Sequence, residues 1–138
     1  MIADMNARSR ARTLAALAFA TLAVAGCMES HEVITGAWSL VEVNGSLPAA
    51  EASISLLPDG TFTMRPGCNT GDGTYAIDGN RLDVDRMSLT MKACGDGANA
   101  QEQTVVTVLE TDPRFEIETG TGRLRMTAGD AVLVFAES

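Results

Sequence analysis

From residue 36 to the C-terminus, apolar and polar residues alternate in short runs, which is the periodicity of β-strands. Turn-forming residues separate the runs, for example Asn44-Gly45 and Pro58-Asp59-Gly60. In the first run the apolar positions change parity after Leu40, which predicts a bulge or a strand that is buried on both faces. Strands are expected around Trp38/Leu40, Ile54/Leu56, Phe62/Met64, Tyr75/Ile77, Leu82/Val84, Met87/Leu89/Met91 (reaching Cys94), Phe115/Ile117, Leu124/Met126 and Leu133/Phe135.

One segment near the middle has a different period. Glu102, Val105, Val106 and Leu109 would fall on one face of a helix. Asn99 with Glu102 three residues later has the spacing of a capping box, and Asp112-Pro113 would end the helix. The β-branched residues 105–108 favour a strand instead, so both structures remain open for this segment.

Together these patterns predict an α+β fold that is mostly antiparallel β. We expect a barrel or half-barrel of about eight short strands, with one helix after the sixth strand. A helix that plugs one opening would cover sheet edges, which otherwise tend to pair with neighbouring molecules.

The N-terminal segment has the composition of a secretory signal. Arginines at positions 8, 10 and 12 precede an apolar run over residues 14–25, and small residues lead directly into Cys27. This order resembles the lipobox of bacterial lipoproteins, which implies a signal peptide over residues 1–26 and lipidation of Cys27. An ordinary cysteine after a plain signal is the alternative. We then expect a tether over residues 27–35 and one domain over 36–138, with Met1 or Met5 as the start.

Charge and location narrow the possible partners. Without residues 1–26 the chain keeps 7 of 10 basic and 17 of 18 acidic residues, a net charge of −10. Such a charge opposes binding to nucleic acids. The lipobox resemblance, with Met28 rather than Asp after Cys27, implies an outer-membrane anchor facing the periplasm. We expect a monomer without a cofactor.

Two further cysteines, Cys68 and Cys94, form an even pair in an oxidising compartment. A structural disulfide is therefore expected, and it would stabilise the fold by roughly 3–4 kcal/mol. A redox-active or metal-binding pair is the alternative, but the chain has no Cys-x-x-Cys, and its only histidine, His31, lies in the predicted tether.

The residue types that carry catalysis are not arranged in a recognisable set, which favours a protein that is not an enzyme. Ser88 and Lys92 lie four residues apart, but nothing else in the sequence brings them together as nucleophile and base. The acidic pairs Asp83/Asp85 and Glu116/Glu118 could act as acid and base or bind Ca²⁺, yet such acids are also ordinary on the surface of an acidic domain. We expect no metal site.

Several motifs together resemble one known family, the META domain family of HslJ-type heat-shock lipoproteins. Gly67-Cys68-Asn69 followed by Gly73-Thr74-Tyr75 is similar to its Gly-Cys-Asn and Gly-x-Tyr signature, and Thr90 to Cys94 is similar to its Thr-x-Met-Ala-Cys segment. Trp38 and the spacing of Glu102, Val106 and Leu109 agree as well. The resemblance implies a small barrel-like α+β domain.

The resemblance also implies a role in the cell envelope, in heat shock or antibiotic tolerance. We expect the protein to bind an envelope component without catalysis. A small-molecule or lipid carrier with an apolar interior is one alternative, in which the adaptable methionines 64, 87 and 91 would line the cavity. A pilot-type chaperone of a secretion complex is the other. The Gly67–Asn69 corner itself could be structural or could bind a ligand.

Overall fold

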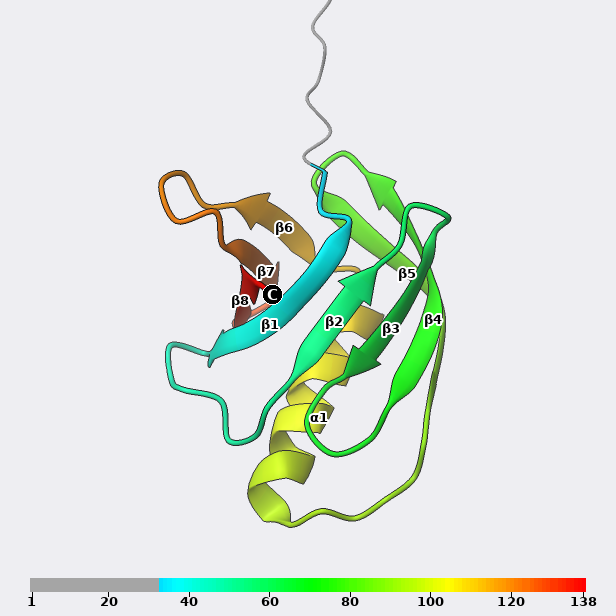
Figure 1. The fold of residues 1–138 in the computed structure, drawn as a ribbon, viewed down its shortest axis with the longest axis vertical. Helices are drawn as coiled ribbons and strands as arrows, with labels where there is room; N and C mark the ends of the chain where they lie inside the picture. Colours follow the sequence, from blue (N-terminus) through cyan, green and yellow to red (C-terminus); the bar gives the residue numbers. More distant parts are fainter. Residues whose placement is uncertain (1–32) are drawn as a thin grey trace, which may run out of the picture.

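The computed structural model describes residues 33–138, where eight antiparallel strands form a closed barrel accompanied by one helix (Figure 1). The predicted signal peptide, Cys27 and most of the tether lie outside the described residues. The predicted barrel with one helix is confirmed. The elements are β1 (Gly36–Val43), β2 (Ser53–Leu56), β3 (Thr61–Arg65), β4 (Gly71–Asp78), β5 (Arg81–Leu89), α1 (Asp96–Glu110), β6 (Arg114–Ile117), β7 (Leu124–Ala128) and β8 (Ala131–Glu137).

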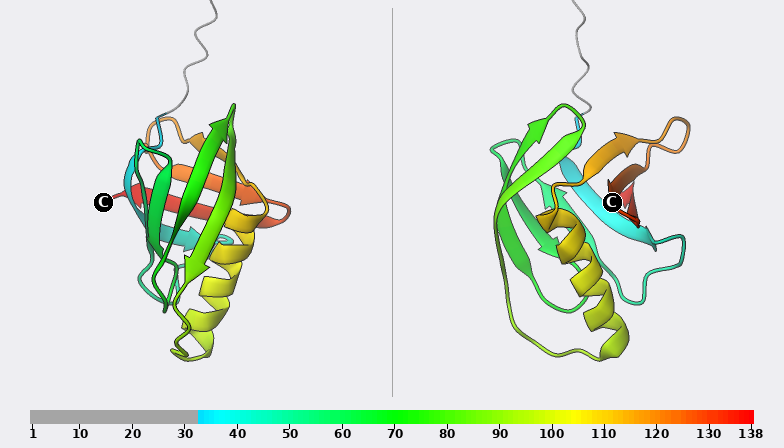
Figure 2. Two further views of the ribbon diagram at one scale, coloured as in Figure 1. Left: turned by 90° about the vertical axis from the view of Figure 1, so that its right-hand side faces the viewer. Right: turned by 180° about the vertical axis from the view of Figure 1, so that it is seen from behind.

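Each strand pairs with the next along the chain, and β8 pairs with β1 to close the barrel. The joint between β5 and β6 is the shortest, with Arg81 opposite Arg114 as its one registered pair. Two flanking bonds, Leu82 N–H to the Pro113 carbonyl and Phe115 N–H to the Asn80 carbonyl, extend it. α1 runs beside this joint, with β4 and β5 on one side and β6 on the other (Figure 2).

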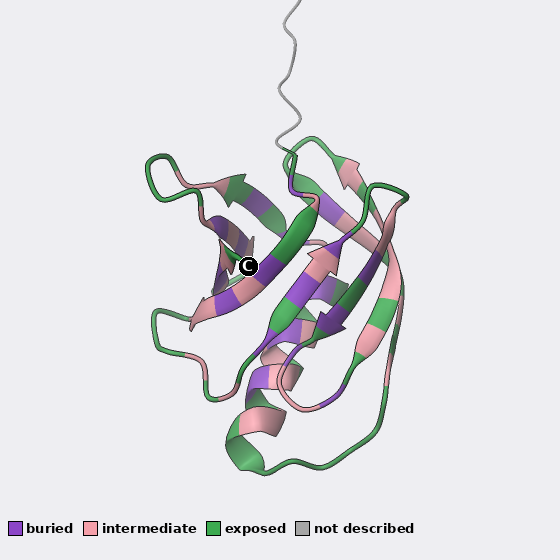
Figure 3. Ribbon diagram, in the orientation of Figure 1, coloured by how far each residue is buried: buried purple, intermediate pink, exposed green. Residues whose placement is uncertain are grey.

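Apolar side chains fill the inside of the barrel. Buried and exposed residues alternate along β2 and β3, as the sequence period predicts (Figure 3). Trp38 is buried, and its indole Nε1 donates to the carbonyl of Ile34 at 2.8 Å, which ties the entering chain to β1. The side chains that are almost fully buried include Leu56, Phe62, Leu82, Val108, Leu109, Leu124, Met126, Leu133 and Phe135.

The change of parity in the first strand corresponds to a bulge. The register between β1 and β8 shifts between Leu40 and Glu42, which confirms this prediction. Asn44 and Gly45 follow with φ angles of 50° and 81°, and Val43 and Ser46 exchange two backbone hydrogen bonds across them. This is the left-handed geometry of a tight turn, for which Asn-Gly is the favoured sequence.

Two predictions about the region before the helix are wrong. The helix follows the fifth strand and not the sixth, because residues 81–89 form one strand whose pairing with β4 shifts register between Thr74 and Tyr75. That strand ends at Leu89, so Met91 does not line the interior. Its side chain is 94% exposed.

The segment with mixed helix and strand signals is a helix, which ends before Asp112 and Pro113 as expected. The predicted capping box is wrong. α1 begins at Asp96 with Gly95 as its N-cap, so Asn99 and Glu102 lie inside it. Its buried residues are Gln101, Val105, Val108 and Leu109, so Val108 replaces Val106 on the fully buried face. Within residues 33–138 no helix is long and apolar enough to span a membrane.

Candidate functional site

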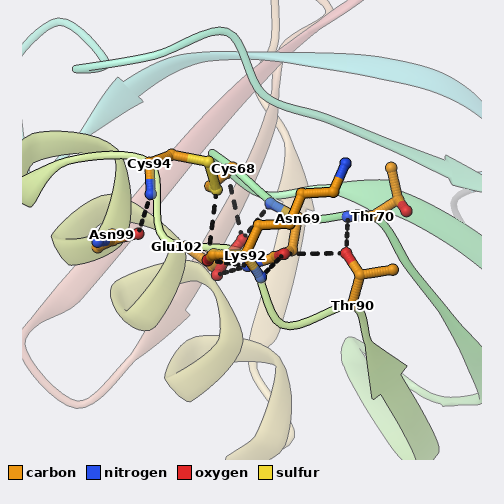
Figure 4. The surroundings of a disulfide bond; sticks show 8 residues. All are labelled: Cys68, Asn69, Thr70, Thr90, Lys92, Cys94, Asn99 and Glu102. Carbon is orange, nitrogen blue, oxygen red and sulfur yellow. Dashed lines mark hydrogen bonds between the residues drawn. A yellow bond between two sulfur atoms is a disulfide. The ribbon is translucent and has the colours of Figure 1, made fainter.

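Four of the signature residues, Cys68, Asn69, Thr90 and Cys94, meet at one corner of the barrel, where the loop between β3 and β4 lies against the segment after β5 and the start of α1 (Figure 4). Cys68 and Cys94 are joined by a disulfide with a Cα–Cα distance of 5.7 Å. The predicted pairing is therefore present. It links segments 26 residues apart, and closing a loop of this length stabilises a fold by about 3.5 kcal/mol in the chain-entropy treatment.

Asn69 is the centre of the corner and is only 3% exposed. Its amide nitrogen donates to Glu102 Oε2 at 2.7 Å and to the Lys92 carbonyl at 3.2 Å. Its amide oxygen accepts from the Lys92 N–H at 2.6 Å and from the Thr90 hydroxyl at 2.9 Å. All the hydrogen-bonding positions of the amide are thus used within the fold.

Glu102 supplies the opposite half of this network from α1. Its Oε1 accepts the backbone N–H of Asn69 at 2.7 Å and that of Cys68 at 3.3 Å. Burial raises the pKa of Glu102, but the hydrogen bonds from Asn69 and Cys68 outweigh burial and hold the pKa below its usual value. The carboxylate is therefore charged at neutral pH. It accepts the backbone N–H groups of Cys68 and Asn69, which have no partner within the loop itself.

The signature glycines are required by close packing. A Cβ on Gly67 would lie 2.7 Å from the carbonyl oxygen of Ala98 in α1. A Cβ on Gly73 would lie 1.9 Å from the carbonyl oxygen of Arg86 and 2.6 Å from the ring of Phe62. Gly67 thus lets the loop touch the helix, and Gly73 makes room for an aromatic ring inside the barrel.

Tyr75, the last residue of the signature's Gly-x-Tyr motif, lies within β4 and contacts the turn between β2 and β3. Its hydroxyl donates to the carbonyl of Leu57, and its backbone N–H donates to the carbonyl of Gly60 at 2.8 Å. Burial, helped by the negative charge of Asp59, raises the pKa of the Tyr75 phenol. Tyr75 therefore stays protonated and holds the turn between β2 and β3.

Sequence reasoning missed Gln101, which is 5% exposed. Its amide nitrogen donates to the carbonyls of Ala50 and Pro66 at 3.0 and 3.1 Å, and its oxygen accepts the Ala50 N–H at 3.1 Å. Gln101 thus ties two loops to α1. Its spacing of four residues from Val105 was the available signal, because residues at that spacing share a helix face.

The other candidate groups do not assemble into a catalytic set. The Ser88 hydroxyl donates to the Asp72 carboxylate rather than to Lys92. Glu116 and Glu118 both face Arg125, at 3.7 and 3.6 Å. Asp83 and Asp85 lie on β5, and within residues 33–138 no three His, Cys, Asp or Glu side chains are grouped closely enough to hold a metal ion.

Comparison with known proteins identifies the family and the fold. The META domain family matches residues 31–138. An NMR structure of a protein from Burkholderia xenovorans is similar with a TM-score of 0.61 at 18% identity, covering 75% of this chain and 81% of that one. A DUF4847 family protein from Bacteroides vulgatus ATCC 8482 is similar with a TM-score of 0.55 at 14% identity, covering 75% and 93%. Among curated proteins none matches.

Proposed function

Because the chain belongs to the META domain family, we propose that it acts as a lipid-anchored, non-enzymatic protein of the bacterial envelope that supports stress or antibiotic tolerance by binding another envelope component. In this proposal Cys27 carries the lipid and the barrel faces the periplasm from the outer membrane. The signature residues then maintain a rigid body, and the outer surface of that body makes the contacts.

The observation that carries this proposal is the saturation of the signature corner. Asn69 and Glu102 bond to each other and to the adjoining backbone, with no hydrogen-bonding position of the Asn69 amide left to face a substrate. Covalent catalysis requires a nucleophile with an adjacent base, and the hydrogen bonds of Asn69 and Glu102 serve the fold instead. The corner is thus a rigid structural element, which supports a binding role for the protein.

The tether supports a position close to the membrane. Six residues lie between Cys27 and Ile34, and the seven Cα-to-Cα steps from one to the other span at most about 25 Å when fully extended. The chain enters the barrel at the same end as the turn between β4 and β5 (Figure 2). A lipid on Cys27 would hold this end within reach of the membrane and leave the helix-side end directed away from it.

The carrier alternative is less well supported. A ligand inside the barrel would have to displace side chains such as Phe62, Leu82 and Met126, which are already buried against each other. The pilot-chaperone alternative rests on likeness of fold alone, and a fold does not determine a function.

Two measurements test the proposal. Intact mass of the native protein should show a chain that begins at Cys27 and carries acyl groups, whereas Cys27→Ala should lack them. In cells, a deletion strain should lose tolerance to envelope stress, and wild type but not Cys27→Ala should restore it. A native protein that is uncut and carries no acyl group would contradict the lipid anchor. A deletion strain with unchanged stress tolerance, together with no detectable envelope partner, would contradict the proposed function.

A further inference from the structure

The outer face of β1–β5 carries three connected depressions. The largest, of about 740 Å³, lies over β3–β5, and a second, of about 460 Å³, lies over β1–β4. Both include Thr63. A third, of about 340 Å³, shares Ser53 and Arg65 with the second. Because they share these lining residues, the three adjoin as one groove that crosses five strands, a length of about 19 Å at the usual spacing between strands.

One row of residues in exact register forms the floor of this groove. Ser55 pairs with Thr63, Thr63 with Asp72, and Asp72 with Ser88. A second row places Thr61 beside Thr74 and Thr74 beside Arg86. Because Phe62 and Met64 point into the core, their neighbours on β3 point outward. The floor therefore consists of hydroxyl groups with a carboxylate and a guanidinium among them.

Some of these groups bond within the fold, Ser88 to Asp72 and Thr61 to Asp59, and the others are free to bond to a ligand. Within residues 33–138 the hydroxyls of Ser55, Thr63 and Thr74 have no protein hydrogen-bond partner. In the same part of the chain, Arg65 and Arg86 have no carboxylate within 4.0 Å, although the protein is acidic. The salt bridges of the described chain lie elsewhere, on β1 and on the segment from β6 to β7.

The composition of the groove discriminates between classes of partner. Protein interfaces have cores enriched in aromatic residues and depleted in Ser and Asp, and the exposed large apolar residues Val33, Leu47, Leu57 and Met91 lie outside this groove. Phosphate-rich polymers are repelled by the net charge of the mature chain. A saccharide hydroxyl both donates and accepts, so it can bond to hydroxyl, carboxylate and guanidinium groups alike.

We propose that the outer groove across β1–β5 binds a linear glycan of the cell envelope. The groove crosses five strands, so it fits a polymer that lies across the strands better than a single sugar. Among the described residues that line the three depressions the one aromatic side chain is Phe62, which is 1% exposed and too buried for stacking, so each sugar unit binds weakly. Repeated units and many anchored copies of the protein raise the overall avidity. This inference rests on the proposed function and names the component bound.

The test is co-sedimentation of the full-length protein, kept in detergent, with purified peptidoglycan sacculi and separately with insoluble chitin. Chitin carries a glycan without peptide stems, so binding to both assigns recognition to the sugar chain. We expect Arg86→Ala to weaken binding about tenfold, the effect of losing a hydrogen bond to a charged group. Arg114→Ala, which removes an exposed arginine on β6, is the matched control and should bind like wild type.

Thr63→Leu is a second test of the site, because it fills the point where two depressions meet and removes a hydroxyl. It should also abolish most binding, and thermal unfolding should show that the variant is folded. Equal binding by wild type, Arg86→Ala and Thr63→Leu would contradict the assignment of the groove as the binding site. Absence of binding to both polymers would contradict the assignment of the ligand as a glycan. Cross-linking to an envelope protein in that case would leave the proposed function standing without this inference.

Discussion

Glu102 accepts both the backbone N–H and the side-chain amide of Asn69, so a helix residue and a loop residue 33 positions apart behave as one unit. The disulfide beside them connects the same loop to the segment before α1. Two separate interactions, the disulfide and the Asn69–Glu102 hydrogen bonds, therefore meet at a single corner. This arrangement makes the stability of the corner testable residue by residue.

Asn69→Asp should destabilise the protein at neutral pH. The replacement has the same shape, but it sets a second carboxylate where the amide nitrogen now lies 2.7 Å from Glu102 Oε2. We expect a loss of about 3 kcal/mol in the free energy of unfolding, from a lost charged hydrogen bond and like-charge repulsion. Urea unfolding measures it. Asn80→Asp, in an exposed turn, is the control, and a loss of similar size there would refute the assignment.

Acid should weaken the corner through Glu102. The folded-state pKa of this group lies below its value of 4.5 in the unfolded chain, so the folded protein releases the proton more readily. Its contribution is complete above that unfolded pKa and is lost as the pH falls through the lower folded pKa. Glu102→Gln should be less stable at pH 7 and should lose less stability than wild type on acidification. Parallel curves of melting temperature against pH would contradict this.

Gly73→Ala should be among the more damaging single-methyl additions. The new Cβ would strike the Arg86 carbonyl and the Phe62 ring, neither of which can move without disturbing the sheet. We expect a loss of about 2–3 kcal/mol, as for other overpacked cores. Gly97→Ala adds the same methyl in α1 at ordinary contact distance, 3.5 Å from Ala49, and should leave the protein as stable or slightly more so. Equal melting temperatures for the two variants would disprove the argument.

Removal of the disulfide should cost stability without dismantling the corner. Cys68→Ser with Cys94→Ser should lower the free energy of unfolding by about 3 kcal/mol, mainly because the unfolded chain gains freedom. Asn69 and Glu102 would still hold the loop against α1. Combining this change with Asn69→Asp tests the coupling, and a more than additive loss is expected because both interactions hold the same loop. Strict additivity would show that they act separately.

Much of the barrel follows from local patterns. Alternation places Ile54, Leu56, Phe62 and Met64 inside, and the parity change marks the bulge in β1, because a strand has only two faces. The Cys68–Cys94 pair follows because these two cysteines are left as an even pair once Cys27 is assigned to the lipid. The positions of Gly67 and Gly73 can be identified from the sequence motif. The contacts with Ala98 and Phe62 that require glycine there depend on the tertiary structure.

Other features could not be read from the sequence. The Asn99–Glu102 spacing predicts a cap from local chemistry alone, whereas Glu102 bonds to a loop more than 30 residues earlier. Met91 continued the apolar period, but the chain had already left the sheet to reach the disulfide. The outer groove is equally invisible, because its floor depends on the register of five strands.

The pairing of β1 with β8 brings together the first and last strands of the described chain, and the final residue, Ser138, donates its N–H to Ala37. The local hairpins can form as soon as their own residues are available, whereas this joint requires both ends of the domain. Contacts so far apart in sequence are slow to form. While the domain folds, β1 must therefore keep one edge unpaired until residues 131–137 reach it, and that interval is when the protein is most exposed to pairing with other chains.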